Sequence, residues 1–148
     1  MVSEAIDTAA LAEQLRPVLL RLARELRRET EALGVTSRQA ALLWLVREHP
    51  DLTLRELATL ERISPPSLSG HVDRLETAGL LERVRSTDDR RRVVLRLTPA
   101  GAQLTRRVRA RRTTWLVTRL RELDDDALES IERAIEPLSA LLSDHHRA

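Results

Sequence analysis

The sequence contains no cysteine, no phenylalanine, no tyrosine and no lysine. Without cysteine the chain forms neither disulfides nor thiolate metal sites, and it cannot sense oxidants through a thiol. Because Trp44 and Trp115 are its only aromatic residues, it lacks the stacked aromatic platforms that bind RNA or single-stranded DNA. The core must therefore be built from Leu, Val, Ile and Ala, a composition that suits helices.

Long hydrophobic runs are also missing. No stretch approaches the ~20 apolar residues that span a bilayer, so no membrane partner is expected. The first residues show neither the basic flank nor the apolar run of an export signal. We therefore expect a soluble cytoplasmic protein, nucleoid-associated if it binds DNA. Its 148 residues, 42% hydrophobic, fit one domain over residues 1–148.

The charge of the chain is unevenly distributed. All 25 basic residues are arginine, and eleven of them lie between Glu82 and Arg112, beside only three acidic residues. From Arg121 onward acidic residues predominate. A basic middle next to an acidic end indicates a localised contact with a polyanion. For the arginine run after Thr105, a solvated helix face is an equally good interpretation.

Local patterns predict the first four helices. Leucine and valine at three- and four-residue spacing predict a helix over 8–32, which Pro17 either kinks or divides and Gly34 ends. Thr36 and Thr53 each precede a Gln or Glu by three residues, the capping-box spacing that starts a helix. The first of these helices is apolar on nearly every side, so it is expected to be buried, with Trp44 in the core.

A third helix start is the sequence Ser64-Pro65-Pro66, where serine caps and proline occupies the first turn. The predicted helices 54–61 and 65–78 form a helix-turn-helix. In the second of them Leu68, Val72 and Leu75 form a narrow apolar stripe, and the remaining surface is small or polar. Such a slim face can enter a major groove and hydrogen-bond to base edges.

The hydrophobic period then changes from helix to strand. Val93, Leu95 and Leu97 alternate with other residues, and 82–85 supplies a partner strand around a charged turn. The turn carries three consecutive arginines, and arginine suits narrow minor grooves. Helices are expected over 99–122 and from Asp124 onward. The fold class is therefore mainly α with a small β-hairpin, a winged helix-turn-helix.

These residues resemble a known family. The run from Ile63 to Glu76 with Gly79-Leu80 is similar to the recognition helix of MarR regulators. Asp89-Arg90-Arg91 and the run 97–101 are similar to their wing. The resemblance covers nearly the whole chain and implies a six-helix homodimer, usually a repressor. In it, helices in 8–33 and 102–146 hold the dimer, and 36–101 form the DNA-binding lobe.

The resemblance also implies roles for single residues. Arg91 would enter the minor groove, braced by a salt bridge from Asp89. Gly70 stands where the family often has arginine, which leaves open which bases are read. Two recognition helices about 34 Å apart would read an inverted repeat in double-stranded DNA. The candidate DNA-binding residues are Ser64, Pro65, Pro66, Ser67, Ser69, Gly70, His71, Arg74, Asp89, Arg90, Arg91 and Arg92.

A small-molecule effector is a further expectation. The family binds small, often aromatic or anionic, ligands between the dimerisation helices and the DNA-binding lobe. By position, Arg16, Leu19, Leu22 and Trp44 are the candidate ligand residues, which is the alternative to a core role for Trp44.

Other functions have less support. His145 and His146 could suggest a metal-responsive regulator, but a frayed tail explains them better. The chain has no Gly-rich phosphate loop, serine elbow or zinc-type His-Glu-x-x-His helix, so no enzyme, metal site or cofactor is expected. The main alternative is a winged-helix module whose arginines bind an acidic partner protein.

Overall fold

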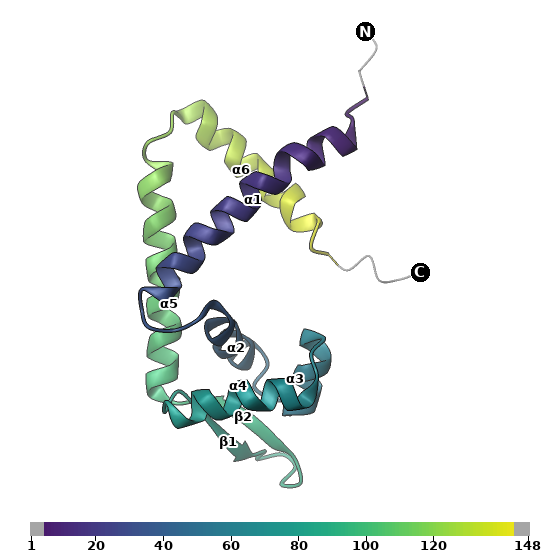
Figure 1. The fold of residues 1–148 in the computed structure, drawn as a ribbon, viewed down its shortest axis with the longest axis vertical. Coiled ribbons are helices and arrows are strands. Elements are labelled where there is room, and N and C mark those ends of the chain that lie inside the picture. The colour runs from purple at the N-terminus through teal and green to yellow at the C-terminus, as the bar shows by residue number, and fades with distance from the viewer. Residues whose placement is uncertain (1–4, 144–148) are drawn as a thin grey trace. The chain divides into compact units, whose positions relative to one another are not determined.

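The computed structural model describes residues 5–143, and in them it places six helices and one two-stranded hairpin (Figure 1). The chain divides into two units, Met1–Arg112 and Thr113–Ala148, which are taken separately below. The elements are α1 (Thr8–Glu31), α2 (Ser37–Glu48), α3 (Leu54–Glu61), α4 (Pro65–Thr77), β1 (Leu81–Arg85), β2 (Val93–Leu97), α5 (Pro99–Leu120) and α6 (Asp125–Ala140).

The predicted helix starts are confirmed. Thr36 and Thr53 each accept a hydrogen bond from the third backbone N–H of their helix, and Gln39 and Glu56 complete the two capping boxes. Ser64 accepts from the N–H of Ser67. Each cap satisfies N–H groups that the first turn of a helix leaves without a partner, which fixes where the helix begins.

Helix α1 differs from the prediction in one respect. It begins after Asp7, whose carboxylate accepts from two backbone N–H groups, and runs without interruption through Pro17. Pro17 therefore does not divide the segment into two helices. The helix ends at Glu31, and Gly34 follows it with a φ of +82°, a conformation that glycine adopts without strain.

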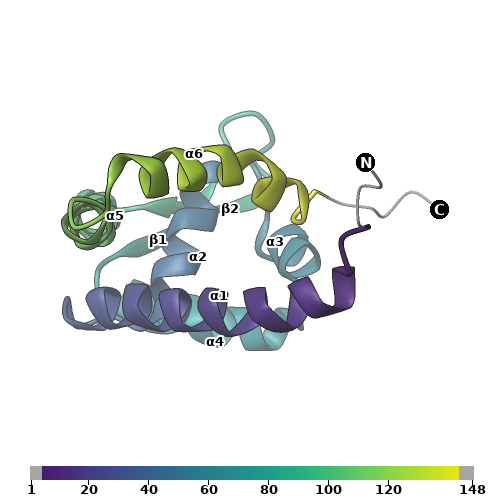
Figure 2. The same cartoon turned by 90° about the horizontal axis from the view of Figure 1, so that it is seen from above.

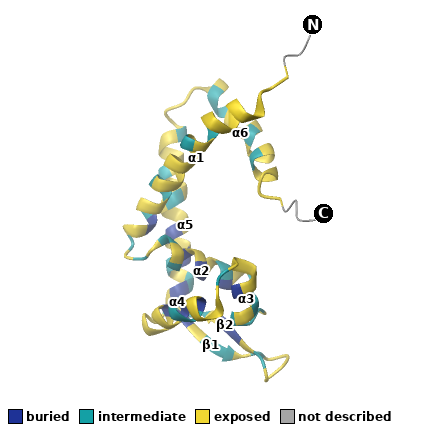
Figure 3. Cartoon of the chain, turned by 45° about the vertical axis from the view of Figure 1, so that its right-hand side comes forward, coloured by how far each residue is buried: buried dark blue, intermediate teal, exposed yellow. Residues whose placement is uncertain are grey.

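The hydrophobic core of the first unit lies among α2, α3, α4 and the hairpin. Figure 3 shows the buried residues concentrated in these elements. Each helix contributes one stripe, and each strand contributes one leucine, so the core fixes the helix-turn-helix and the hairpin as one body. The buried members are Leu42, Leu43, Val46, Leu57, Ala58, Leu68, Val72, Leu75, Leu81 and Leu95.

The hairpin is antiparallel, with Leu81 opposite Leu97 and Arg85 opposite Val93. Its burial departs from simple alternation, because Val93 is exposed whereas Val94 and Leu95 are both buried. The cause is an isolated bridge between Val94 and Thr53, which brings the segment before α3 against β2. The wing (residues 81–97) is thus in contact with the helix-turn-helix through β2 as well as through the core.

The start of α5 makes a close approach to the segment after α4. The backbone N–H of Thr98 donates to the carbonyl oxygen of Leu80 at 3.1 Å, and the Thr98 hydroxyl donates to that of Gly79 at 2.6 Å. The same hydroxyl accepts from the N–H of Gly101. A Cβ atom on Gly101 would overlap the carbonyl oxygen of Leu80. Glycine at position 101 therefore allows the first turn of α5 to pack against the segment that follows α4.

The second unit consists, in its described part, of the end of α5 and all of α6. Helix α6 starts after Asp124, which accepts from the N–H of Ala127. On α5 the guanidinium of Arg119 lies 4.5 Å from the centre of the Trp115 ring. None of the residues of α6 is buried. Among residues 5–143, no helix combines the length and the apolarity that a membrane crossing requires.

Replacing Gly101 with alanine should destabilise the fold, because the added methyl group meets backbone that cannot move aside. We expect a loss of about 1–3 kcal/mol in the free energy of unfolding, measured by denaturant titration at fixed protein concentration. Gly70→Ala is the matched control, since a Cβ there meets nothing within 4 Å and alanine favours a helix. Equal stability of the two variants would contradict the close approach.

Candidate DNA-binding surface

Helix α4 has one buried face and one slim exposed face. Leu68, Val72 and Leu75 are almost completely buried, as the predicted stripe requires. Away from this buried stripe, α4 exposes Pro66, Ser67 and Arg74. A Cβ atom at Gly70 would meet open space, so the backbone there can be approached closely. These features make α4 a helix that a major groove can accommodate.

His71 of α4 lies between two arginines from different helices. Its Nε2 atom is 3.5 Å from Nη1 of Arg38, and its Nδ1 atom is 3.4 Å from Nη1 of Arg74. Arginine can only donate, and a neutral imidazole has one acceptor nitrogen, so His71 accepts from one arginine at a time. This cluster brings Arg38 of α2 beside α4, a placement that local sequence patterns did not predict.

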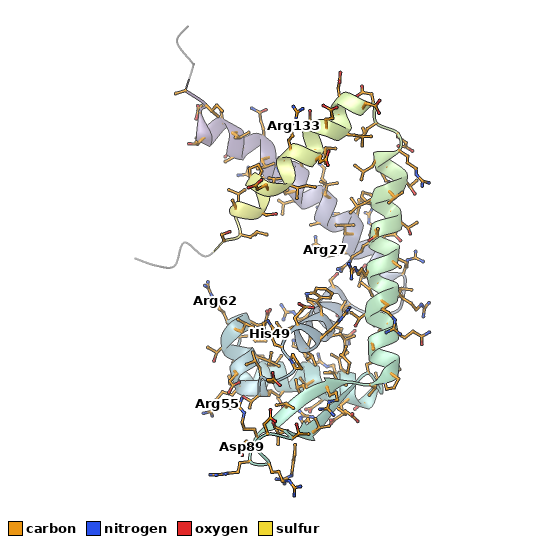
Figure 4. All side chains as sticks on the ribbon, turned by 180° about the vertical axis from the view of Figure 1, so that it is seen from behind. Arg27, His49, Arg55, Arg62, Asp89 and Arg133 are labelled. Atoms are coloured by element: carbon orange, nitrogen blue, oxygen red, sulfur yellow. The ribbon has the colours of Figure 1, made fainter. Side chains whose placement is uncertain are left out.

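The tip of the wing presents Arg91 to solvent. The Arg91 side chain is 96% exposed, and its Nε atom lies 3.8 Å from Oδ1 of Asp89. The same carboxylate oxygen accepts from the backbone N–H of Arg91 at 3.0 Å. The Asp89 carboxylate thus contacts both the backbone N–H and the side chain of Arg91, and the role of Arg91 in a minor groove stays a prediction. Figure 4 labels Asp89 in the loop at the end of the hairpin, and Figure 2 shows this loop projecting beyond the strands.

Arg92 points in a different direction from Arg91. Its Nη2 atom donates to both carboxylate oxygens of Glu56, at 2.7 and 2.9 Å, and to the carbonyl oxygen of Asp51 at 3.2 Å. Glu56 also completes the cap of α3 by accepting from the N–H of Thr53. The hydrogen bond from Arg92, followed by that from Thr53, holds the pKa of Glu56 below its ordinary value of 4.5.

Arg83 of β1 makes the other charged contact between wing and helix-turn-helix. It donates to Asp73 at 2.7 Å and to Glu76 at 2.9 Å, both on α4, and lies 3.4 Å from the hydroxyl of Ser69. Asp73 chiefly raises the pKa of Arg83 above its usual value. Because Arg83 pairs with these two carboxylates, it offsets about half of their negative charge on the helix that would face DNA.

The predicted ligand residues lie on α1 and α2. Arg16 forms an ion pair with Glu13 on its own helix at 2.8 Å, and Leu19 and Leu22 are exposed. Trp44 is 44% exposed, with the guanidinium of Arg47 5.5 Å from its ring centre. The expectation that Trp44 belongs to the core is therefore wrong, because the buried face of α2 is formed by its neighbours Leu42, Leu43 and Val46. The ligand site itself stays a prediction.

The two histidines that suggested a metal-responsive regulator lie outside the described part of the chain. His145 and His146 are not among residues 5–143. Within those residues, no group of three or more His, Asp and Glu side chains is arranged to hold a metal ion. His49 lies at the end of α2 and His71 lies in the arginine cluster.

A helix-turn-helix joined to an arginine-tipped hairpin defines a winged helix-turn-helix protein. The family model for the MarR family matches residues 35–93, from the cap of α2 to the start of β2. An uncharacterised HTH-type transcriptional regulator of Mycobacterium leprae is 30% identical over 92% of this chain and 95% of that protein. This chain belongs to the MarR family and is a DNA-binding transcriptional regulator.

Solved structures show the same fold. A MarR family protein from Bacillus stearothermophilus is 26% identical, with a TM-score of 0.79 over 92% of this chain and 95% of that one. A mutant of Staphylococcus aureus MepR bound to an oligodeoxyribonucleotide is 21% identical, with a TM-score of 0.67 over 90% of this chain and 98% of that one. The arrangement of six helices and a wing is thus the one found in MarR proteins.

The ion pair of Glu56 should give stability a specific pH dependence. A carboxyl group whose pKa is lowered by folding stabilises the protein above its ordinary pKa of 4.5, and this contribution is lost as the pH falls through the lower folded value. Glu56→Gln keeps a capping side chain of the kind Gln39 provides but lacks the charge. We expect the variant to be less stable than the parent at pH 7 and the difference to shrink as the pH drops below 4.5, as measured by thermal unfolding.

The control is Glu61→Gln on the same helix, a side chain with no ion pair among the described residues. Its stability difference from the parent should change little with pH. A Glu56→Gln difference that persists unchanged to low pH would contradict the assigned pairing.

Proposed function

We propose that this chain is a repressor that acts as a homodimer on an inverted-repeat operator. The observation that supports it most is the presence, on one lobe, of a slim polar α4 face and an exposed arginine tip. A recognition helix in the major groove and an arginine in the adjacent minor groove are the two contacts such a lobe can make together. A homodimer that occupies an inverted repeat within a promoter would block transcription by excluding the polymerase.

Each part of the surface has a separate role in this proposal. Ser67, His71 and Arg74 would reach base edges or phosphates, and Gly70 would let the helix backbone approach the groove closely. Ser64, Pro65, Pro66 and Ser69 would lie at the start and flank of that contact. Arg90 and Arg91 would enter or follow the minor groove. That a MepR mutant of the same fold binds an oligodeoxyribonucleotide supports the docking of this lobe on DNA.

The exposed apolar residues of α1 and α6 support the homodimer. Isoleucine and leucine recur on one side of α6, yet none of them is buried, and Ile135 is 61% exposed. Helix α1 likewise leaves Leu11, Val18 and Leu22 exposed. Apolar stripes of this extent mark a protein–protein interface. A second copy of the chain is the partner proposed here, because an inverted repeat presents two equal half-sites.

A protein-interaction module remains the contrasting hypothesis, with the arginines of the wing facing an acidic partner. It predicts weak duplex binding that is indifferent to sequence. The repressor predicts tight, sequence-selective binding that weakens steeply with salt, because each neutralised phosphate contributes a slope of about −0.9 in log K against log salt.

Removing the wing tip should weaken DNA binding. We expect Arg91→Ala to lower affinity for the preferred duplex by about tenfold or more at fixed salt, because an arginine in a narrow minor groove contributes strongly. Fluorescence anisotropy with a labelled duplex measures this. Arg24→Ala on α1, an exposed arginine outside the DNA-binding lobe, is the control. Parental affinity in Arg91→Ala would refute the assigned role of the wing.

Charge within the apolar stripe of α6 should dissociate the dimer. We expect Ile135→Arg to shift the protein toward monomer at concentrations where the parent is dimeric, since burying an unpaired charge at an interface is costly. Sedimentation equilibrium gives the mass directly. Glu136→Arg, an exposed position off the stripe on the same helix, should leave the dimer intact. A monomeric parent would overturn the homodimer.

A further inference from the structure

We propose that Arg92 is a positioning residue that fixes the wing on the helix-turn-helix through Glu56, rather than a DNA contact like its neighbours. The inference rests on the DNA-binding function proposed above. It assigns different roles to three consecutive arginines that the sequence alone cannot tell apart.

The first observation is the contrast between Arg91 and Arg92. The Arg91 side chain is 96% exposed, and within residues 5–143 its one charged partner is Asp89, two residues away. The Arg92 side chain is 39% exposed. It approaches both carboxylate oxygens of Glu56 and the carbonyl oxygen of Asp51, which precede it in the chain by 36 and 41 positions. These contacts direct the guanidinium of Arg92 toward α3, whereas that of Arg91 extends into solvent at the tip of the wing.

The second observation is that the backbone of Arg92 closes the wing loop. Its N–H donates to the carbonyl oxygen of Asp89 at 2.9 Å, and its carbonyl oxygen accepts from the N–H of Ser86 at 2.8 Å. Arg92 therefore closes the wing loop through its backbone and attaches the loop to α3 through its side chain. Fixing Arg92 fixes the neighbouring backbone from which Arg91 and Arg90 extend.

The third observation is that Glu56 is itself held in place. Its carboxylate accepts from the N–H of Thr53, and Thr53 forms the bridge to Val94 of β2. The start of α3 is thus joined to the wing at two points, one through backbone and one through the ion pair. Two strands alone are marginally stable in water, so these attachments preorganise the tip. A preorganised tip loses less conformational entropy when it binds.

The test uses the sign of an electrostatic effect. Removing a negative charge near bound DNA ordinarily strengthens binding, because it reduces repulsion from phosphate. If Arg92 were a DNA contact that Glu56 merely competes for, Glu56→Gln would tighten binding. If Glu56 holds the wing in place through Arg92, Glu56→Gln must weaken binding although it removes a negative charge.

We expect Glu56→Gln and Arg92→Met each to lower affinity for the selected duplex by about tenfold in the full-length protein. The double variant should lose no more affinity than either single variant, because both substitutions break the same contact. In both single variants the slope of log K against log salt should stay at the parental value. In Arg91→Ala the magnitude of this slope should fall by about 0.9, the contribution of one phosphate contact. Glu61→Gln on α3 is the control and should bind at least as tightly as the parent.

A second readout needs no DNA. Hydrogen exchange of the free protein should be faster in residues 86–92 of both variants, with exchange in the core of α4 unchanged. Exchange at the parental rate in both variants would overturn the proposal. So would equal or tighter DNA binding by Glu56→Gln, or a slope lowered by about 0.9 in Arg92→Met. If the parent binds no duplex selectively, the proposed function fails, and the exchange measurement still decides whether Arg92 fixes the wing.

Discussion

The wing depends for its structure on the helix-turn-helix, because a hairpin of two strands cannot bury enough surface to be stable alone. Each strand supplies one leucine to the core, and two arginines of the wing add charged contacts. Arg83, in the middle of β1, reaches α4, and Arg92, just before β2, reaches α3. The position of the arginine tip relative to the recognition helix follows from these four attachments. Everything inferred about DNA binding depends on that relative position.

Arg83 and Arg92 also reduce the negative charge on the surface that is proposed to approach phosphate. Asp73, Glu76 and Glu56 would repel DNA if they were unpaired. Arg83 pairs with the first two and Arg92 with the third, so two arginines of the wing offset part of the charge of three carboxylates. Arg91 stays exposed, and it is the arginine proposed to interact with the duplex. In this proposal arginine both pairs with acidic groups of the lobe and contacts DNA, in a chain whose basic residues are all arginine.

Local features were predictable from sequence and long-range contacts were not. The caps Thr36, Thr53 and Ser64 and the stripe of α4 were predicted because each depends on a few neighbouring residues. Trp44 was misplaced because α2 is apolar on nearly every side, so its sequence does not indicate which side lacks a covering element. The partners of Arg83 and Arg92 were missed because ion pairs across the chain depend on the tertiary fold. The need for glycine at position 101 likewise became evident only when Leu80 lay beside it.

The most direct test of the central claim is selection of preferred duplexes from a random pool by the full-length protein. We expect an inverted repeat whose half-sites are centred about one duplex turn, roughly 34 Å, apart, since two recognition helices related by a two-fold axis would enter successive major grooves on one face. A pool that yields no preferred sequence, or a preferred sequence without two-fold symmetry, would contradict it.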